Sequence, residues 1–215
     1  ITVKNHQSKK FVVWGIGKFN NNRDDVTYVE CENELHLIKE FLIFWEKHQP
    51  DIITGWNTEF FDIPYLCNRI KNLCGDDEIK RLSPWRSVHS REVFQMGRKH
   101  QLYEIQGVAH LDYFDLYRKF TYSSQESYRL DHIAFVELGE KKDGNPYETF
   151  RDWYTKDYQS FLEYNIMDVE LVDKLEDKMK LIELCLTMAY DAKVNYMDVL
   201  GSTKYWDVLI YNYLI

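Results

Sequence analysis

The sequence lacks the marks of several protein classes. It has no run of about 18 consecutive apolar residues, the length that a membrane-spanning helix needs, so we expect no contact with a membrane. Its 4 cysteines form no C-x-x-C pair, which argues against a zinc site and favours a reduced, intracellular protein. We find no internal repeat or low-complexity tract, and we expect no secretory signal peptide before the first strand-like segment.

The composition is typical of a folded domain. Of the 215 residues, 45% are hydrophobic and 16% are aromatic, which is enough to bury a core in one large domain or two small ones. The net charge of −8 argues against a protein that coats nucleic acid by charge alone. It does not exclude an enzyme that acts on nucleic acid, because a site built from carboxylates and metal ions is itself acidic.

The pattern of apolar residues predicts an α/β fold with a mixed sheet. Residues 10–19, 26–29 and 52–54 are rich in β-branched and aromatic residues, as strands are, and residues 108–114 are predicted as a further strand. Apolar and polar residues alternate along residues 92–105 on both sides of Gly97, which predicts a β-hairpin. Helical spacing is found at residues 35–45, 63–73, 127–134, 156–190 and 203–215.

Asp62 is a first candidate for chemistry. It lies between Phe61 and Ile63, shortly after an apolar strand and one residue before the proline of a predicted helix. It could be an ordinary helix N-cap. It could also belong to a site, because sites in open α/β sheets form beyond the carboxyl ends of strands.

Asp168 is a second candidate. It interrupts an otherwise apolar helical stripe through residues 161, 164, 171, 172 and 175, where a charge is costly unless it is paired or binds a metal. It could therefore form a buried salt bridge or bind a metal ion. Tyr164 is four residues earlier, so its phenol faces the same way. Asp112 and Asp115 are weaker candidates, with Asp115 interpreted as the cap of a helix over residues 116–120.

The two aspartates fit one chemical idea. Mg²⁺ prefers oxygen ligands, and a pair of such ions stabilises the attacking and leaving oxygens when a phosphodiester is hydrolysed. Tyr164 could orient the attacking water. If Asp62 and Asp168 share a metal pair, their carboxylates should lie within about 8 Å of each other.

These motifs together resemble a known family. GWNTEFFDIPYL (residues 55–66) is similar to the second exonuclease motif of family B DNA polymerases, and YNIMD (residues 164–168) is similar to their third motif. RLSPW, HLDYFDLYRKF and SYRLDHIAFVEL resemble segments of the T-even-like phage branch. The resemblance covers nearly the whole chain, and its motif order is specific.

The resemblance implies a ribonuclease-H-like 3′–5′ exonuclease domain that proofreads single-stranded 3′ ends with two Mg²⁺ or Mn²⁺ ions. Asp62 and Asp168 match metal-binding carboxylates, and Tyr164 matches a water-orienting tyrosine. Asn57 and Phe61 match positions near the substrate strand. The hairpin matches an inserted element that helps to separate primer from template, with Arg98 and Lys99 facing phosphates. A lysine of the loop that holds Lys141 and Lys142 would reach the site.

One part of the family pattern is missing. Its first motif, Asp-x-Glu, has no counterpart, since Glu30 and Glu32 lie on or after a later strand. We therefore expect residues 1–198 to be an exonuclease domain that is incomplete at its N-terminus, and residues 199–215 to begin a connection toward the polymerase palm. Such a fragment would bind metal weakly and excise little.

Other functions remain open. The chain could be a non-catalytic module that binds a DNA strand or acts as a scaffold in replication, a stand-alone exonuclease, or a structural protein. The basic stretch from Lys80 to Lys99, with six lysines and arginines against one acid, could be a solvated face or a DNA contact. The resemblance implies further partners: single-stranded 3′ ends, primer–template DNA, the palm, fingers and thumb, and a sliding clamp. It implies the cytoplasm of an infected bacterium as the location.

Overall fold

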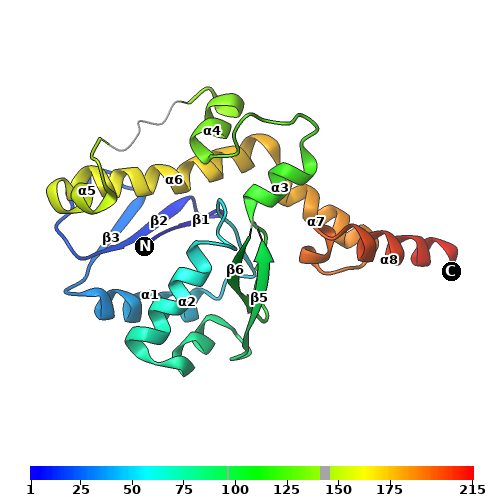
Figure 1. Cartoon of the computed structure of the whole chain (residues 1–215), viewed down its shortest axis with the longest axis horizontal. Helices are drawn as coiled ribbons and strands as arrows, with labels where there is room; N and C mark the ends of the chain where they lie inside the picture. Colours follow the sequence, from blue (N-terminus) through cyan, green and yellow to red (C-terminus); the bar gives the residue numbers. More distant parts are fainter. Residues whose placement is uncertain (96, 141–145) are drawn as a thin grey trace. The chain divides into compact units, whose positions relative to one another are not determined.

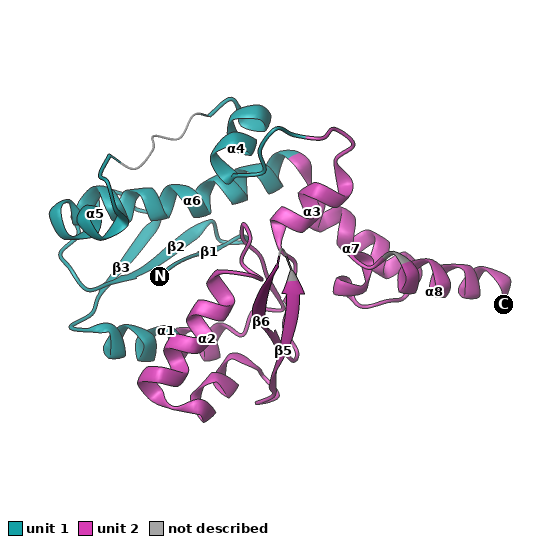
Figure 2. Cartoon of the chain, in the orientation of Figure 1, with its two compact units in different colours: residues 1–41, 125–178 teal, residues 42–124, 179–215 magenta. Residues whose placement is uncertain are grey.

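The computed structural model describes residues 1–95, 97–140 and 146–215. The chain forms two compact units (Figures 1 and 2). The first contains Ile1–Phe41 and Gln125–Lys178, and the second contains Leu42–Ser124 and Met179–Ile215. Helix α1 (Glu34–His48) begins in the first unit and ends in the second. None of the helices in the described residues is long and apolar enough to cross a membrane.

The first unit contains a mixed three-stranded sheet. Strand β2 (Lys10–Gly15) lies in the middle, antiparallel to β1 (Thr2–Asn5) and parallel to β3 (Val26–Glu30). Strand β2 ends four residues earlier than predicted. At Gly15 the backbone approaches the hydroxyls of Tyr28 and Tyr158 so closely that a Cβ atom would collide with them, and the Ile16 N–H donates to the Tyr158 hydroxyl at 2.9 Å.

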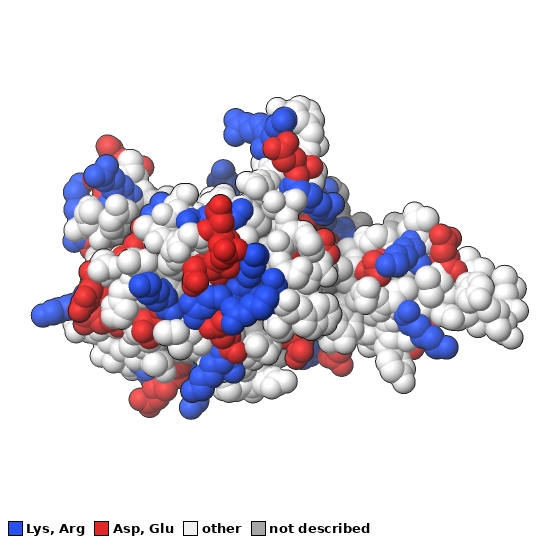
Figure 3. All heavy atoms as spheres, turned by 90° about the horizontal axis from the view of Figure 1, so that it is seen from below, with Lys and Arg blue, Asp and Glu red and all other residues white. Residues whose placement is uncertain are grey.

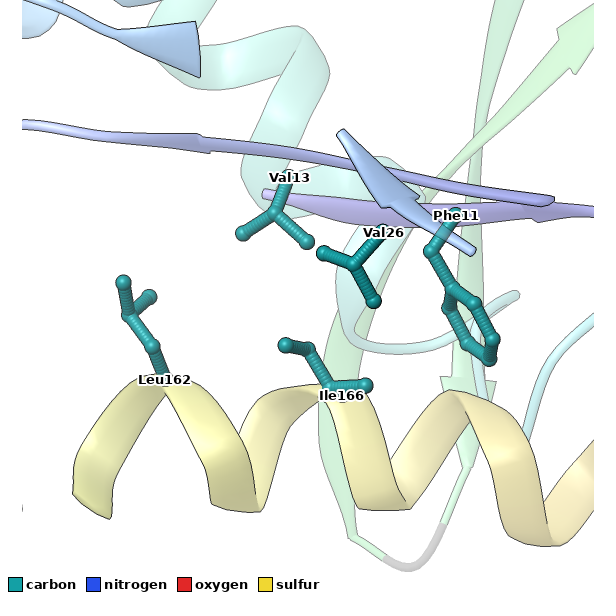
Figure 4. Close-up of a cluster of buried hydrophobic side chains, with 5 residues drawn as sticks. All are labelled: Phe11, Val13, Val26, Leu162 and Ile166. Carbon is teal, nitrogen blue, oxygen red and sulfur yellow. The ribbon is translucent and has the colours of Figure 1, made fainter. Parts of the chain in front are cut away.

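Three further helices complete the first unit: α4 (Leu130–Leu138), α5 (Phe150–Lys156) and α6 (Tyr158–Met179). Figure 4 shows how α6 packs on the sheet. Phe11, Val13 and Val26 come from the strands and meet Leu162 and Ile166, which are four residues apart on α6. All are buried, and a fully buried side chain of this kind stabilises the fold by about 1.5–3 kcal/mol. The sheet therefore fixes α6 firmly.

The second unit contains two strand pairs. Strand β4 (Ile52–Ile53) is parallel to β7 (Ala109–His110), and β5 (Val88–Gln95) is antiparallel to β6 (Arg98–Ile105) around Gly97. Strand β6 packs on α2 (Asp62–Cys74), where the Tyr103 hydroxyl donates to Asn68 Oδ1 at 2.8 Å. The remaining elements are the 3₁₀ helices η1 (Asp76–Leu82) and η2 (Tyr196–Val199), with α3 (Tyr113–Phe120), α7 (Leu181–Ala192) and α8 (Ser202–Leu214).

The α/β class and the mixed sheet are confirmed, but two more predictions were wrong besides the end of β2. The long helix predicted for residues 156–190 is two helices, α6 and α7, because Lys180 adopts a left-handed conformation with φ of 57°. The strand predicted for residues 108–114 is only the two residues of β7, because α3 begins at Tyr113.

Candidate functional site

Asp62 is the first residue of α2 and is exposed. The N-cap position belongs to Phe61, which makes no side-chain capping hydrogen bond. The interpretation of Asp62 as an N-cap was therefore wrong. A carboxylate in the first turn of a helix is stabilised by the helix dipole, typically by about 0.3–1 kcal/mol, and Asp62 holds such a position while remaining open to solvent.

The segment around Asp62 presents an amide and two aromatic rings. Asn57 is exposed and adopts a left-handed conformation with φ of 60°. Phe61 is 66% exposed and Tyr65 is 62% exposed. Their rings are stacked with an interplanar angle of 9°. Exposed aromatic faces of this kind can stack on the bases of a single strand.

Asp112 holds this segment in place and was underestimated from the sequence. It is 2% exposed and caps α3 by accepting from the Phe114 N–H at 3.0 Å. The same carboxylate accepts from the backbone N–H groups of Asn57 and Glu59, each at 2.9 Å. The interpretation of Asp115 as the cap was wrong, since it lies in the first turn of α3. The signal that would have found the cap is an aspartate directly before a helical pattern.

Carboxylates gather around this segment. Burial raises the pKa of Glu59, and the nearby charges of Asp115 and Asp112 raise it further, while Arg91 opposes them. Burial also raises the pKa of Asp115, with Asp112 adding to the effect. The pKa of Asp112 is raised by burial as well, although its N–H donors favour the charged form.

Tyr164 and Asp168 lie on α6 in the first unit and are half-buried. The ring of Tyr164 packs edge-on against Trp153 of α5, with 4.7 Å between the centroids. The predicted stripe is buried at Leu171, Val172 and Leu175. In its N-terminal half the prediction was wrong, because Leu162 and Ile166 are the residues that face the sheet.

The candidate residues therefore come from both units. Asp62, Asn57 and Phe61 belong to the second unit, and Tyr164 and Asp168 belong to the first. That the two carboxylates share one site stays a prediction. Lys141 and Lys142 lie outside the described residues.

The basic stretch is largely neutralised by acids within the second unit. Five of its six lysines and arginines lie within salt-bridge distance of a carboxylate, in the pairs Lys80–Asp77, Arg81–Glu46, Arg86–Glu46, Arg91–Glu59 and Lys99–Glu92. Arg98 is exposed, and the described residues supply no carboxylate partner for it. Figure 3 shows one face of the molecule, where basic and acidic side chains are interleaved. Arg98 is thus the most available cation of the stretch.

One other group could be mistaken for a metal site. Side-chain ligand atoms of His6, Asp173 and Asp177 lie within 4.8 Å of one another. However, Lys9 Nζ lies 3.0 Å from Asp173 and 2.9 Å from Asp177, and Lys4 Nζ lies 2.6 Å from Asp173. The two ammonium groups already neutralise these carboxylates and would repel a metal ion. We therefore interpret this group as a set of structural ion pairs rather than a metal site.

Comparisons with known proteins show which family this chain is similar to. A family model described as "DNA polymerase family B, exonuclease domain" matches residues 3–133. A DNA-directed DNA polymerase of Escherichia phage RB69 is 40% identical over 193 residues, and one of Enterobacteria phage T4 is 38% identical over 192 residues. A DNA polymerase of Orgyia pseudotsugata multicapsid polyhedrosis virus is 27% identical over 168 residues.

The match covers most of this chain and a small part of each relative. The two phage polymerases align with 89% of this chain, and the aligned part is 21% of their own length. For the polyhedrosis virus polymerase the shares are 74% and 16%.

Proposed function

Since the chain belongs to the family of exonuclease domains of family B DNA polymerases, we propose a specific role for it. We propose that it is the proofreading 3′–5′ exonuclease domain of a phage-type polymerase. Its reaction is hydrolysis of the 3′-terminal phosphodiester of single-stranded DNA. The observation that carries the proposal is Asp62, exposed in the first turn of α2 within the matched residues and directly after an exposed aromatic ring.

The donor set fits Mg²⁺ or Mn²⁺. Asp62 is an exposed carboxylate and Asp168 a half-buried one, and hard divalent ions take such oxygen ligands. Asp62 and Asp168 would hold the metal. Bound there, divalent ions would stabilise the charge that develops on the attacking and leaving oxygens.

The other residues supply position. Trp153 fixes the ring of Tyr164, so its hydroxyl would hold the attacking water in a constant orientation. The stacked rings of Phe61 and Tyr65 would receive the terminal base of a single strand, and the exposed amide of Asn57 would accept or donate hydrogen bonds beside it.

A release assay tests the proposal. The full-length polymerase that we propose carries this sequence should release nucleotides from the 3′ end of a labelled oligonucleotide in Mg²⁺ or Mn²⁺. Release should stop when EDTA removes the metal. A non-catalytic strand-binding module would bind the same oligonucleotide and leave it intact, and that result would refute the proposal.

The hairpin should contribute to DNA binding mainly through Arg98. Replacing Arg98 with alanine should weaken binding to a primer–template and lower the slope of log affinity against log salt by roughly one. Replacing Lys99 should have a smaller effect, because Glu92 lies 3.2 Å from its ammonium group. Lys80→Ala is the matched control, since Asp77 lies 2.6 Å from that lysine. If the Arg98 variant keeps the wild-type slope, Arg98 is a solvated surface residue that does not contact DNA.

The wider setting is part of the same proposal. It includes a ribonuclease-H-like sheet, a hairpin that separates primer from template, and a domain boundary after residue 198. The palm, fingers and thumb of the parent would follow, with a sliding clamp as a further partner. The source would be a phage that replicates in the cytoplasm of an infected bacterium.

A further inference from the structure

A single buried carboxylate holds the loop between β4 and α2. Asp112 Oδ1 accepts from the Asn57 N–H at 2.9 Å and from the Phe114 N–H at 3.0 Å. Its Oδ2 accepts from the Glu59 N–H at 2.9 Å and from the Thr58 hydroxyl at 3.4 Å. One side chain therefore satisfies three consecutive residues of the loop together with the first turn of α3.

The loop transmits this restraint to α2. The Asn57 carbonyl accepts from the Phe61 N–H at 3.2 Å, and the Thr58 carbonyl accepts from the Ile63 N–H at 3.0 Å. Phe61 and Ile63 flank Asp62 on either side. The position of the Asp62 backbone thus follows from the positions of Asn57 and Thr58, which Asp112 fixes.

Further contacts close the loop onto the same support. The Tyr113 N–H donates to the Gly55 carbonyl at 2.8 Å. A Cβ at Gly55 would collide with the methyl group of Thr58, so the loop folds tightly over this glycine. Thr58 Oγ1 also lies 2.8 Å from His110 Nε2. Burial lowers the pKa of His110 to about 4, so the neutral ring can donate to the Thr58 hydroxyl, whose own proton is then available to Asp112.

We propose that Asp112 is a positioning residue for excision, which sets the place of Asn57, Phe61 and Asp62 without touching the DNA itself. This inference rests on the proposed exonuclease function. It explains why an aspartate stands here rather than an asparagine. All four partners of Asp112 are donors, and an asparagine amide has only one acceptor oxygen. Its NH₂ group would face either the Glu59 N–H or the N–H groups of Asn57 and Phe114.

The test is Asp112→Asn in the full-length polymerase. Asparagine caps helices as well as aspartate does, so α3 and the fold should survive. The amide protons of Asn57 or Glu59 should exchange with solvent faster than in the wild type. The kcat for excision of a single-stranded oligonucleotide should fall by up to about a hundredfold, because small misplacements of reacting groups cost that much. The rate of nucleotide addition should not change.

Asp115→Asn is the matched control. It removes one carboxylate charge from the same turn of α3, but Asp115 makes no hydrogen bond to the loop among those described, so exchange and kcat should stay at wild-type values. Unchanged exchange at Asn57 and Glu59 in the Asp112 variant would overturn the inference whatever the activity. Faster exchange with an unchanged kcat would overturn it as well. A wild-type polymerase without excision would instead refute the proposed function, and this inference with it.

Discussion

Replacing Asp168 with alanine in the full-length polymerase should abolish excision of a 3′ end and leave nucleotide addition largely intact. A carboxylate that holds a catalytic metal supports several kcal/mol of transition-state stabilisation, so we expect the excision rate to fall by about a thousandfold or more. Nucleotide addition would take place in another domain of the proposed parent and would not sense this change. The measurement is the rate of release from a labelled single strand beside the rate of primer extension.

The structure also predicts that the Asp168 variant folds. The buried residues that join α6 to the sheet are Leu162 and Ile166, and Asp168 is half-buried outside that contact. If Asp168 shares the proposed metal site with Asp62, removing its carboxylate relieves repulsion between like charges when metal is absent. Glu163→Ala, which removes an exposed carboxylate from the same helix, is the control and should excise normally. A large drop in melting temperature for Asp168→Ala alone would favour a buried salt bridge.

The sequence correctly predicted the helices and strands in which apolar and polar residues alternate with a regular period. Residues 63–73 alternate apolar and polar positions with helical spacing, and α2 covers them. Phe11 and Val13 differ by two positions and both face α6, as a strand with one buried face requires. The candidate residues Asp62, Tyr164 and Asp168 could be found because each interrupts such a pattern with a polar group.

Features that depend on tertiary contacts could not be predicted this way. Strand β1 has only four residues, of which Thr2, Lys4 and Asn5 are polar, and its pairing with β2 gives it its conformation. No glycine or proline marks the break at Lys180. The role of Asp112 depends on backbone N–H groups about 55 residues away in the chain. A local sequence pattern does not show that these groups lie close to Asp112 in the fold.

The ion-pair group at the N-terminus is a feature of the same kind, and it leads to the largest expected effect on stability. Asp173 of α6 is 9% exposed and bonds Lys4 at 2.6 Å, Lys9 at 3.0 Å and His6 at 2.7 Å. Lys4 is 11% exposed. The group therefore fastens β1 and the turn after it to the helix that carries Tyr164 and Asp168.

Replacing Asp173 with asparagine should lower the free energy of unfolding by about 3 kcal/mol, since it leaves the ammonium group of Lys4, which is only 11% exposed, without its counter-charge. The melting temperature should fall by about 6–12 °C. Asp177→Asn is the control. Asp177 bonds the same Lys9 at 2.9 Å but is 49% exposed, so its loss should cost less than about 1 kcal/mol. Equal losses of unfolding free energy in the two variants would show that burial does not determine how much each of these ion pairs contributes to stability.

The pH dependence gives an independent check on Asp173. Burial alone would raise the pKa of this carboxyl, but the hydrogen bonds from Lys4, Lys9 and His6 outweigh burial and hold the pKa below its ordinary value. A carboxyl with a depressed pKa contributes its stability above the unfolded pKa of about 3.9, and the contribution disappears as the pH falls through the folded pKa. In urea unfolding, the difference in free energy of unfolding between wild type and Asp173→Asn should therefore vary by less than about 0.5 kcal/mol from pH 5 to 7. It should shrink below about pH 4. A difference that persists undiminished in acid would mean that the variant loses packing rather than charge.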